Sequence, residues 1–265
     1  MPTKCIQFTT AGVHTFNVPI GVTAVWLTMI GAGAGSGGAV MSSFQEAGGG
    51  GGSGEIAQRI MRVVPSGGTV TVTIGAGGTA SSGGLTEPGG DGGATSFGPV
   101  TTVNGGGGGG QENLGGGGGG GGHGYNININ APYGGSGGEQ GAPLRGRAST
   151  PPFLGPQNQD GTFGKKSTPC FHGGGLGGCG GTSLLDSGNG SPLGGWPGGS
   201  KFANIETGGA GASTFLGKGA DAVISSNGAN ATVNGTGASA GSGPVGNHSG
   251  GTGADGYCLV QWIEP

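Results

Sequence analysis

The sequence predicts an all-β protein in two parts: a small antiparallel β-sheet or sandwich at one end, joined to a bundle of polyglycine-II helices, with essentially no α-helix. Three observations support this fold. Glycine supplies 77 of the 265 residues, several times its usual share of about 7%. Short segments that alternate polar and apolar residues, as half-buried strands do, occupy both ends of the chain. No segment shows the apolar spacing of an amphipathic helix.

The first predicted strands are brief and are bounded by turn residues. They cover residues 4–9, 13–18 and 23–30, where polar and apolar side chains alternate. We expect a turn at residues 11–12 and a break at Pro19, because glycine and proline interrupt strands.

Three more strands complete the predicted sheet. Residues 55–64 and 69–74 both alternate, and the Pro-Ser-Gly-Gly sequence at 65–68 predicts a hairpin between them. The last strand covers residues 256–264. Because strands lie at both ends of the chain, we expect the last one to close against the first ones. The predicted sheet domain therefore comprises 1–103 plus 253–265.

The glycine-rich part, predicted at residues 104–252, has two possible explanations. One is a flexible linker, because glycine loses the most backbone entropy on ordering. The other is a set of packed polyglycine-II helices, which have three residues per turn and direct every N–H and C=O at neighbours. Many glycine clusters separated by single apolar residues favour the packed bundle. An interior helix is then expected to need glycine throughout, and a peripheral one to carry an outward side chain at every third residue.

Weak internal repeats also favour an ordered bundle. Residues 93–98, 181–185 and 211–217 each place small polar residues before an apolar one. We interpret these as points where the chain tucks an apolar side chain under the bundle before it turns. The strict Gly-X-Y repeat of collagen is absent.

Glycine becomes sparse at residues 123–171, and aromatic and basic residues appear there. Binding residues are often found on loops that a rigid scaffold carries, so we predict a binding tip here. Exposed aromatics bury much area at little entropic cost, and arginine pairs with anionic groups. The candidate contacts are Tyr125, Tyr133, Phe153, Phe163, Trp196, Arg145 and Arg147. The alternative, that an aromatic only fills space beside the bundle, weighs most for Phe163 and Trp196.

Patterns of catalytic and metal-binding residues are missing from the sequence. It contains no HExxH or GxSxG motif, and its many GxGxxG matches are expected by chance in so glycine-rich a chain. We therefore predict no enzyme and no cofactor. Cys170, His172 and Cys179 match no strong zinc-ligand spacing, so no metal is predicted. Cys5 and Cys258, in the first and last predicted strands, are candidates for neighbours.

Charge and hydropathy restrict the partners. Charged residues make up 8% of the chain and the net charge is -3, without the Lys/Arg stripe typical of nucleic-acid binders. No apolar run approaches the roughly 20 residues that span a bilayer. Residues 1–5 do not begin a secretory signal, so we expect synthesis in the host cytoplasm and release by lysis, as in a virus particle.

Several segments resemble the glycine-rich domain of bacteriophage tail fibre and tail tip proteins. The resemblance rests on Phe-Thr-Thr-Ala-Gly-Val-His-Thr-Phe-Asn-Val-Pro at 8–19, Gly-Ala-Gly-Ala-Gly at 31–35, residues 93–104 before polyglycine, and Gly-Ala-Asp-Gly-Tyr at 253–257. These segments extend from near the start of the chain to near its end, so the resemblance covers the whole chain. The middle is similar to the distal adhesins of T-even-like phages, although the longer N-terminal attachment domain of those adhesins has no counterpart here.

The resemblance implies a virion protein of the tail fibre or tail tip. It would bind a bacterial outer-surface receptor, protein or glycan, through loops on a glycine-packed scaffold. Other tail proteins would be its partners, with a homo-oligomer, a trimer by analogy, in which outward residues such as Trp26 and Arg59 form the attachment surface. The alternatives are a structural tail or baseplate protein without receptor contact, and an ice-binding or structural glycine-rich protein.

Overall fold

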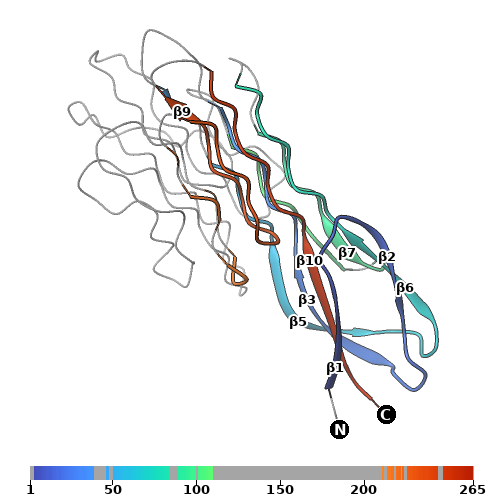
Figure 1. Cartoon of the computed structure of the whole chain (residues 1–265). Coiled ribbons are helices and arrows are strands. Elements are labelled where there is room, and N and C mark those ends of the chain that lie inside the picture. The colour runs from blue at the N-terminus through green and yellow to red at the C-terminus, as the bar shows by residue number, and fades with distance from the viewer. Residues whose placement is uncertain are drawn as a thin grey trace, which may run out of the picture.

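The computed structural model is elongated (Figure 1), with the two four-stranded sheets and both chain termini at one end and glycine-rich segments extending from these sheets. It describes residues 3–38, 46–47, 50–83, 89–99, 101–109, 211, 214–217, 219–221, 223, 226–243 and 247–264. The described residues contain β-strands and no helix. The predicted all-β fold class is confirmed.

The first sheet joins the two ends of the chain. Its strands are β1 (Thr3–Phe8), β10 (Tyr257–Ile263), β3 (Ala24–Ile30) and β5 (Ile56–Val63), in that order. All neighbours are antiparallel. The last strand therefore lies between the first and the third, as its terminal position predicted.

The second sheet contains β2 (Gly12–Asn17), β6 (Thr69–Ile74), β7 (Thr95–Phe97) and β8 (Thr101–Val103), again in antiparallel order. A separate two-residue pair joins β4 (Glu46–Ala47) to β9 (Ser242–Gly243). The strand positions predicted from alternation agree with the observed ones to within one or two residues.

The predicted hairpin at residues 65–68 is wrong. The segment does turn, with the Gly68 N–H donating to the Pro65 carbonyl at 2.9 Å. However, β5 pairs with β3 and β6 pairs with β2, so the turn carries the chain from one sheet to the other. Turn residues show where a chain reverses, but not whether the next strand pairs alongside or crosses to a facing layer. On β6 the crossing leaves Val72 and Ile74 buried, whereas Met61 and Val63 on β5 remain exposed.

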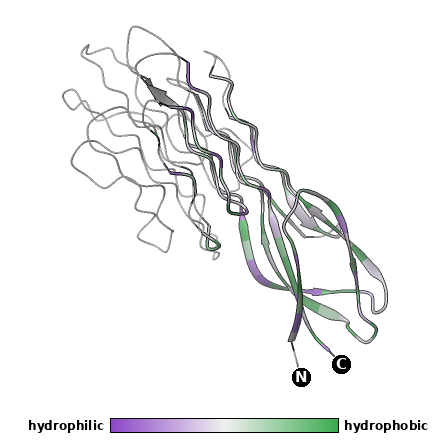
Figure 2. Ribbon diagram, in the orientation of Figure 1, coloured by the Kyte–Doolittle hydropathy of each residue, from purple (hydrophilic) through white to green (hydrophobic). Residues whose placement is uncertain are grey.

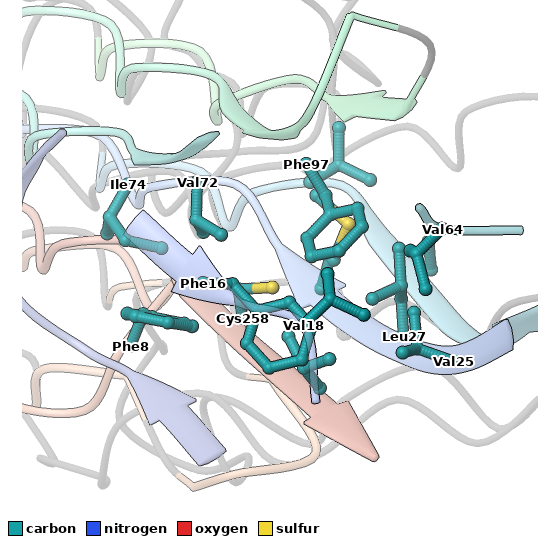
Figure 3. Packing of buried hydrophobic residues seen from close by; sticks show 14 of the residues in the cluster. Phe8, Phe16, Val18, Val25, Leu27, Val64, Val72, Ile74, Phe97 and Cys258 are labelled. Carbon is teal, nitrogen blue, oxygen red and sulfur yellow. The ribbon is translucent and has the colours of Figure 1, made fainter. Parts of the chain in front are cut away.

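The hydrophobic core fills the space between the two sheets (Figure 3). Val25, Leu27 and Met29 of β3 are completely buried, as are Val72 of β6 and Cys258 of β10. Phe16 packs between the layers, with its ring centroid 6.1 Å from that of Phe97 and 5.5 Å from that of Trp262. Along β6, Val72 and Ile74 point inward while Thr69 and Thr71 are exposed, which is why a period-two pattern is visible in its sequence.

Beyond the core, the strands continue directly into glycine-rich segments. In Figure 2 these segments are mostly pale, whereas the strands carry strong hydrophobic and hydrophilic colours. Three segments lead away from the sheets (31–38, 75–83, 104–109) and three lead back to them (50–55, 89–94, 250–256). Glycine-rich segments therefore alternate with strands within residues 1–109 as well as in the later part of the chain.

Segment 31–38 lies at the centre of a bundle. Its N–H groups donate to three neighbouring segments in turn, so that residues three apart donate to the same neighbour. Gly31 and Ala34 donate to Glu55 and Gly52 of the first neighbour. Ala32 and Gly35 donate to Gly93 and Gly90 of the second, and Gly33 and Ser36 donate to Ala254 and Gly251 of the third. Its carbonyls accept in the same rotation from 104–109, 75–81 and 236–241. A repeat of three residues with bonds in all directions is the polyglycine-II pattern.

The six neighbours of the central segment also bond to one another in a closed ring. Going round, the order is 50–55, 104–109, 89–94, 75–81, 250–256 and 236–241, and the last bonds the first. Adjacent members run in opposite directions, since residue numbers rise along one as they fall along the next. The glycine-rich segments of the described residues therefore form an ordered lattice, as the packed-bundle interpretation predicted.

The expectation that an interior segment needs glycine throughout is wrong. A Cβ at Gly33 would lie 1.8 Å from the Thr236 carbonyl oxygen, so glycine is required there. Ala32, Ala34 and Ser36 nevertheless sit on the same segment with no exposed surface. The lattice therefore has room for a methyl or hydroxymethyl group at alternate residues of its central segment.

The expectation for peripheral segments is confirmed on segment 75–83. Ala76, Thr79 and Ser82, three residues apart, are exposed, while Gly75 and Gly78 are buried. The Cβ atoms at the exposed positions point away from the lattice, so side chains are tolerated there.

Of the three internal repeats, residues 93–98 are described in full and the repeat at 211–217 is described at residues 211 and 214–217. In residues 93–98, Phe97 enters the sandwich core. In residues 211–217, Phe215 packs against Ile30, Ile56 and Tyr257, where the sheet meets the bundle. Phe97 is buried and Phe215 is partly buried, each beside a turn. Residues 181–185 lie outside the described residues.

Candidate functional site

The end of the bundle remote from the chain termini is where the long connections begin and end. Segment 31–38 leads out to residues 39–49, segment 75–83 to 84–88, and segment 104–109 to 110–210. The longest connection contains the predicted binding tip. The described residues at this end form the platform from which these connections leave.

Backbone contacts fix this platform. Gly109 donates its N–H to the Gly35 carbonyl and accepts a hydrogen bond from Gly89, each at 2.8 Å. A Cβ on Gly38 would lie 2.8 Å from the Gly83 Cα and 2.5 Å from the His248 carbonyl oxygen. Five separate segments therefore come close together at this end, and the point where the chain leaves Gly109 is held by two neighbours.

Side-chain oxygens take the place of missing neighbours at the bundle surface. Asp91 Oδ1 accepts from the Gly108 N–H at 2.8 Å, beside the start of the longest connection. Asn227 and Asn230, three residues apart, accept from the backbone N–H groups of Ser249 and Thr252 at 3.0 and 2.9 Å. Our sequence reasoning missed these residues. The signal was available as asparagines at the polyglycine-II spacing in Asn-Gly-Ala-Asn.

Asp255 joins the bundle to the sandwich in the same way. Its Oδ1 accepts from Gly77 at 3.0 Å and its Oδ2 from Ala11 at 2.9 Å. Close by, the Asn234 side-chain amide donates to the Thr9 and Gly256 carbonyls at 2.7 and 2.9 Å. These two side chains fix the angle between the two parts of the scaffold.

The predicted contact residues Tyr125, Tyr133, Arg145, Arg147, Phe153, Phe163 and Trp196 lie outside the described residues. The predicted attachment residues are described. Trp26 is half-buried on β3, and Arg59 is exposed on β5 with a φ of 52°, where the pairing of β3 with β5 shifts register. Trp26 lies opposite Met61, which is 58% exposed, so one face of the first sheet carries apolar side chains in solvent.

The described cysteines are free. Cys5 is exposed and Cys258 is buried. They occupy paired strands, but Cys5 lies opposite Gln261 and Cys258 opposite Phe8, so they are not direct partners. Burial raises the pKa of the Cys258 thiol to about 12, which keeps this thiol neutral and unreactive at ordinary pH.

The residues that the structure describes contain no group of three potential metal ligands from His, Cys, Asp and Glu. The set Cys170, His172 and Cys179 falls outside them. Within the same described ranges, no helix is long and apolar enough to cross a membrane.

The comparison with protein families covers nearly the whole chain. A family model described as a glycine-rich domain matches residues 9–263. The chain belongs to this glycine-rich domain family. The match covers every bundle segment described above and the strands of both sheets except β1, which ends at Phe8. A search of curated proteins finds no match.

Proposed function

We propose that this glycine-rich domain is a bacteriophage tail fibre or tail tip adhesin that binds a receptor on the bacterial surface through loops at the far end of its bundle. The observation that carries the proposal is the separation of the two ends. Both termini leave from the sandwich (Figure 1), whereas the connection that contains the candidate contacts starts at Gly109, at the opposite end. A protein held by its termini would thus present that connection outward.

The bundle suits the role of a stiff spacer. A polyglycine-II helix rises about 3.1 Å per residue, so segment 31–38 extends roughly 25 Å. Bonds from this segment to six neighbours oppose bending in every direction. A rigid support lowers the entropic cost when the loops engage a receptor. The same bundle suits long connections, because loops carried on a rigid scaffold tolerate changes in length and sequence.

The candidate contacts have the chemistry for adhesion. Tyr125, Tyr133 and Phe153 offer large, stiff surfaces, while Arg145 and Arg147 offer donors for carboxylate or phosphate groups. Either an outer-membrane protein or a lipopolysaccharide presents such groups. Under this proposal the chain acts without catalysis or cofactor, in the virion, with other tail proteins at its sandwich end and copies of itself as further partners.

Binding of the purified, fluorescently labelled chain to a panel of bacterial strains tests the proposal. We expect saturable binding to some strains, and loss of at least about tenfold in affinity when Tyr125, Tyr133, Arg145 and Arg147 are all replaced by alanine. The variant Thr79→Ala, an exposed change on the bundle, is the matched control and should bind as the parent does. Exchange of residues 123–171 for those of a relative should change the strains that are bound.

The structural alternative gives the opposite result. If the chain binds none of the strains, or if the four-residue variant binds all of them as the parent does, adhesion through these residues is wrong. A tail or baseplate protein without receptor contact would then be the better proposal.

A further inference from the structure

A cleft of about 490 Å³ opens between the two sheets on the side where β5 is the outermost strand of one and β8 of the other. Its lining comes from the end of β5, the start of β6 and the turn after β7: Arg62, Val63, Val64, Pro65, Thr69, Val70, Thr71, Phe97, Gly98 and Pro99. This volume is within the range of sites that bind ligands.

The walls of the cleft are mainly apolar. Val64 and Phe97 are buried core residues on the same side of the cluster (Figure 3), and Val70 is partly buried. Pro65 and Pro99 extend the apolar surface toward solvent. An apolar side chain placed here would continue the packing of the sandwich core.

Arg62 is the single charged side chain among the described residues that line this cleft. Its Nε donates to Thr101 Oγ1 on β8, and its Nη1 donates to the Met61 carbonyl at 3.0 Å. Both acceptors are neutral. The ion pair found among the described residues joins Lys4 to Glu264 and does not involve Arg62. Two hydrogen bonds therefore hold a guanidinium in place while part of its five-donor set stays available for an anion.

The backbone beside the cleft favours an extended ligand. Within the described residues, β5 pairs with β3 alone and β8 with β7 alone, so each has an open edge on this side. Arg62 and Thr101 bridge the two edges. An edge strand can hydrogen-bond an extended peptide along its length, and pockets beside it select alternate side chains.

We propose that this cleft binds an extended segment of another protein in which a carboxylate side chain is flanked by apolar or β-branched side chains. The carboxylate pairs with Arg62, and a neighbouring apolar side chain enters the space between Val64, Val70 and Phe97. The edge of β5 or β8 supplies backbone hydrogen bonds. The inference does not depend on the proposed adhesin function.

An array of capped pentapeptides tests this site with the full chain. Each probe has glutamate at its centre and valine, isoleucine or threonine at the flanking positions, and each has a twin with glutamine at the centre. We expect a subset of glutamate peptides to bind at least about tenfold more tightly than their twins. Arg62→Gln should abolish that difference, and Arg62→Lys should retain part of it.

Two controls isolate the cleft. Arg59→Gln changes an exposed arginine on the same strand, outside the cleft, and should leave peptide binding unchanged. Thr71→Trp, at an exposed lining position of β6, should block the cleft without disturbing the core. Unchanged melting curves for all variants confirm that they fold.

The proposal is overturned if no glutamate peptide binds better than its glutamine twin, or if the variant Arg62→Gln binds as the parent does. It is equally overturned if N-acetylvaline competes as well as the best peptide, because a small carboxylate would then be sufficient. Binding to bacterial cells is measured separately, so the two proposals succeed or fail independently.

Discussion

The sandwich and the bundle satisfy the hydrogen bonds of the same backbone in different ways. In the sheets, a strand such as β3 bonds two neighbours in one plane, and buried side chains such as Leu27 fill the space above it. In the bundle, segment 31–38 bonds six neighbours all round, and backbone occupies the space that side chains would take. Packing is specified by side-chain shape in one part and by the absence of Cβ atoms in the other.

The change from pairing in a sheet to packing in the bundle occurs between one residue and the next. Ile30 ends β3 and Gly31 begins the central segment, just as Ile74 ends β6 and Gly75 begins a ring segment. The chain keeps its direction through each change (Figure 1). The residue type at each position therefore decides whether the backbone hydrogen-bonds to neighbours within a sheet or to neighbours on all sides.

The largest expected effect is from a single methyl group in the bundle. Gly33→Ala would place a Cβ 1.8 Å from the Thr236 carbonyl oxygen, a contact with backbone that cannot move alone. We expect the free energy of unfolding to fall by about 4 kcal/mol or more, or the bundle to fail to form. Denaturant unfolding and amide hydrogen exchange across residues 31–37 measure this.

Its control is the neighbouring position. Ala34→Gly removes a methyl group that the lattice already accommodates, and it should cost only about 1.5 kcal/mol through lost burial and added chain entropy. If Gly33→Ala cost no more than Ala34→Gly, close backbone packing would not be what holds the bundle together.

The free energy of unfolding should fall at high pH because a side chain in the sandwich is buried. The Cys258 thiol has an ordinary pKa of 9.0, and burial raises its pKa to about 12. Between these values the unfolded chain releases the proton and the folded chain keeps it. Stability is thus intact below pH 9 and falls as pH rises toward 12, by at most about 1.4 kcal/mol per pH unit. Unfolding curves between pH 8 and about 10.5 measure the slope.

The variant Cys258→Ala should reduce that slope, even though its cavity lowers stability at all pH values. The pKa of Tyr257 is also raised, by burial first and then by the charges of Cys258 and Cys5, so part of the slope should persist. An identical slope in parent and variant would mean that the thiol is not buried as described.

The smallest expected effect concerns the surface of the bundle. Asn230→Ala removes the acceptor of the Thr252 N–H, and we expect a loss of about 0.5–1 kcal/mol because water can replace an exposed partner. Faster exchange of the Thr252 amide should accompany it. Thr232→Ala, an exposed change on the same segment, should have no measurable effect. Equal losses for both variants would show that the asparagine bond contributes nothing specific.

Alternation found six strands, which are β1, β2, β3, β5, β6 and β10. It missed β4, β7, β8 and β9, which are only two or three residues long and too short to show a period. It identified β6 with both ends correct and placed β10 against the N-terminal strands. It did not assign strands to sheets, since β5 and β6 have the same inward pattern whether they pair or face each other. The crossing at Pro65 to Gly68 depends on which neighbours bury them, and that is a property of the assembled sandwich.

The bundle was predictable in kind but not in its contacts. The three-residue spacing of Ala76, Thr79 and Ser82 follows from helix geometry alone. The position of Gly-Ala-Gly-Ala-Gly-Ser at the centre does not, because small side chains at 32, 34 and 36 resemble those of a surface segment. The sequence likewise did not mark Arg62 as part of a site. Its cleft is built from β5, β6 and the turn after β7, and the sequence signals for strands and turns do not show that these segments meet.

The closed ring around segment 31–38 has a consequence for how this protein is made. The central segment is synthesised about 200 residues before its neighbours 236–241 and 250–256. Its hydrogen bonds therefore join residues more than 200 positions apart, as between Ser36 and Gly251. Contacts so distant in sequence slow folding. On the ribosome, the central segment cannot complete its hydrogen bonds until residues 236–256 have been synthesised, and a product that stops before them leaves those bonds unmade.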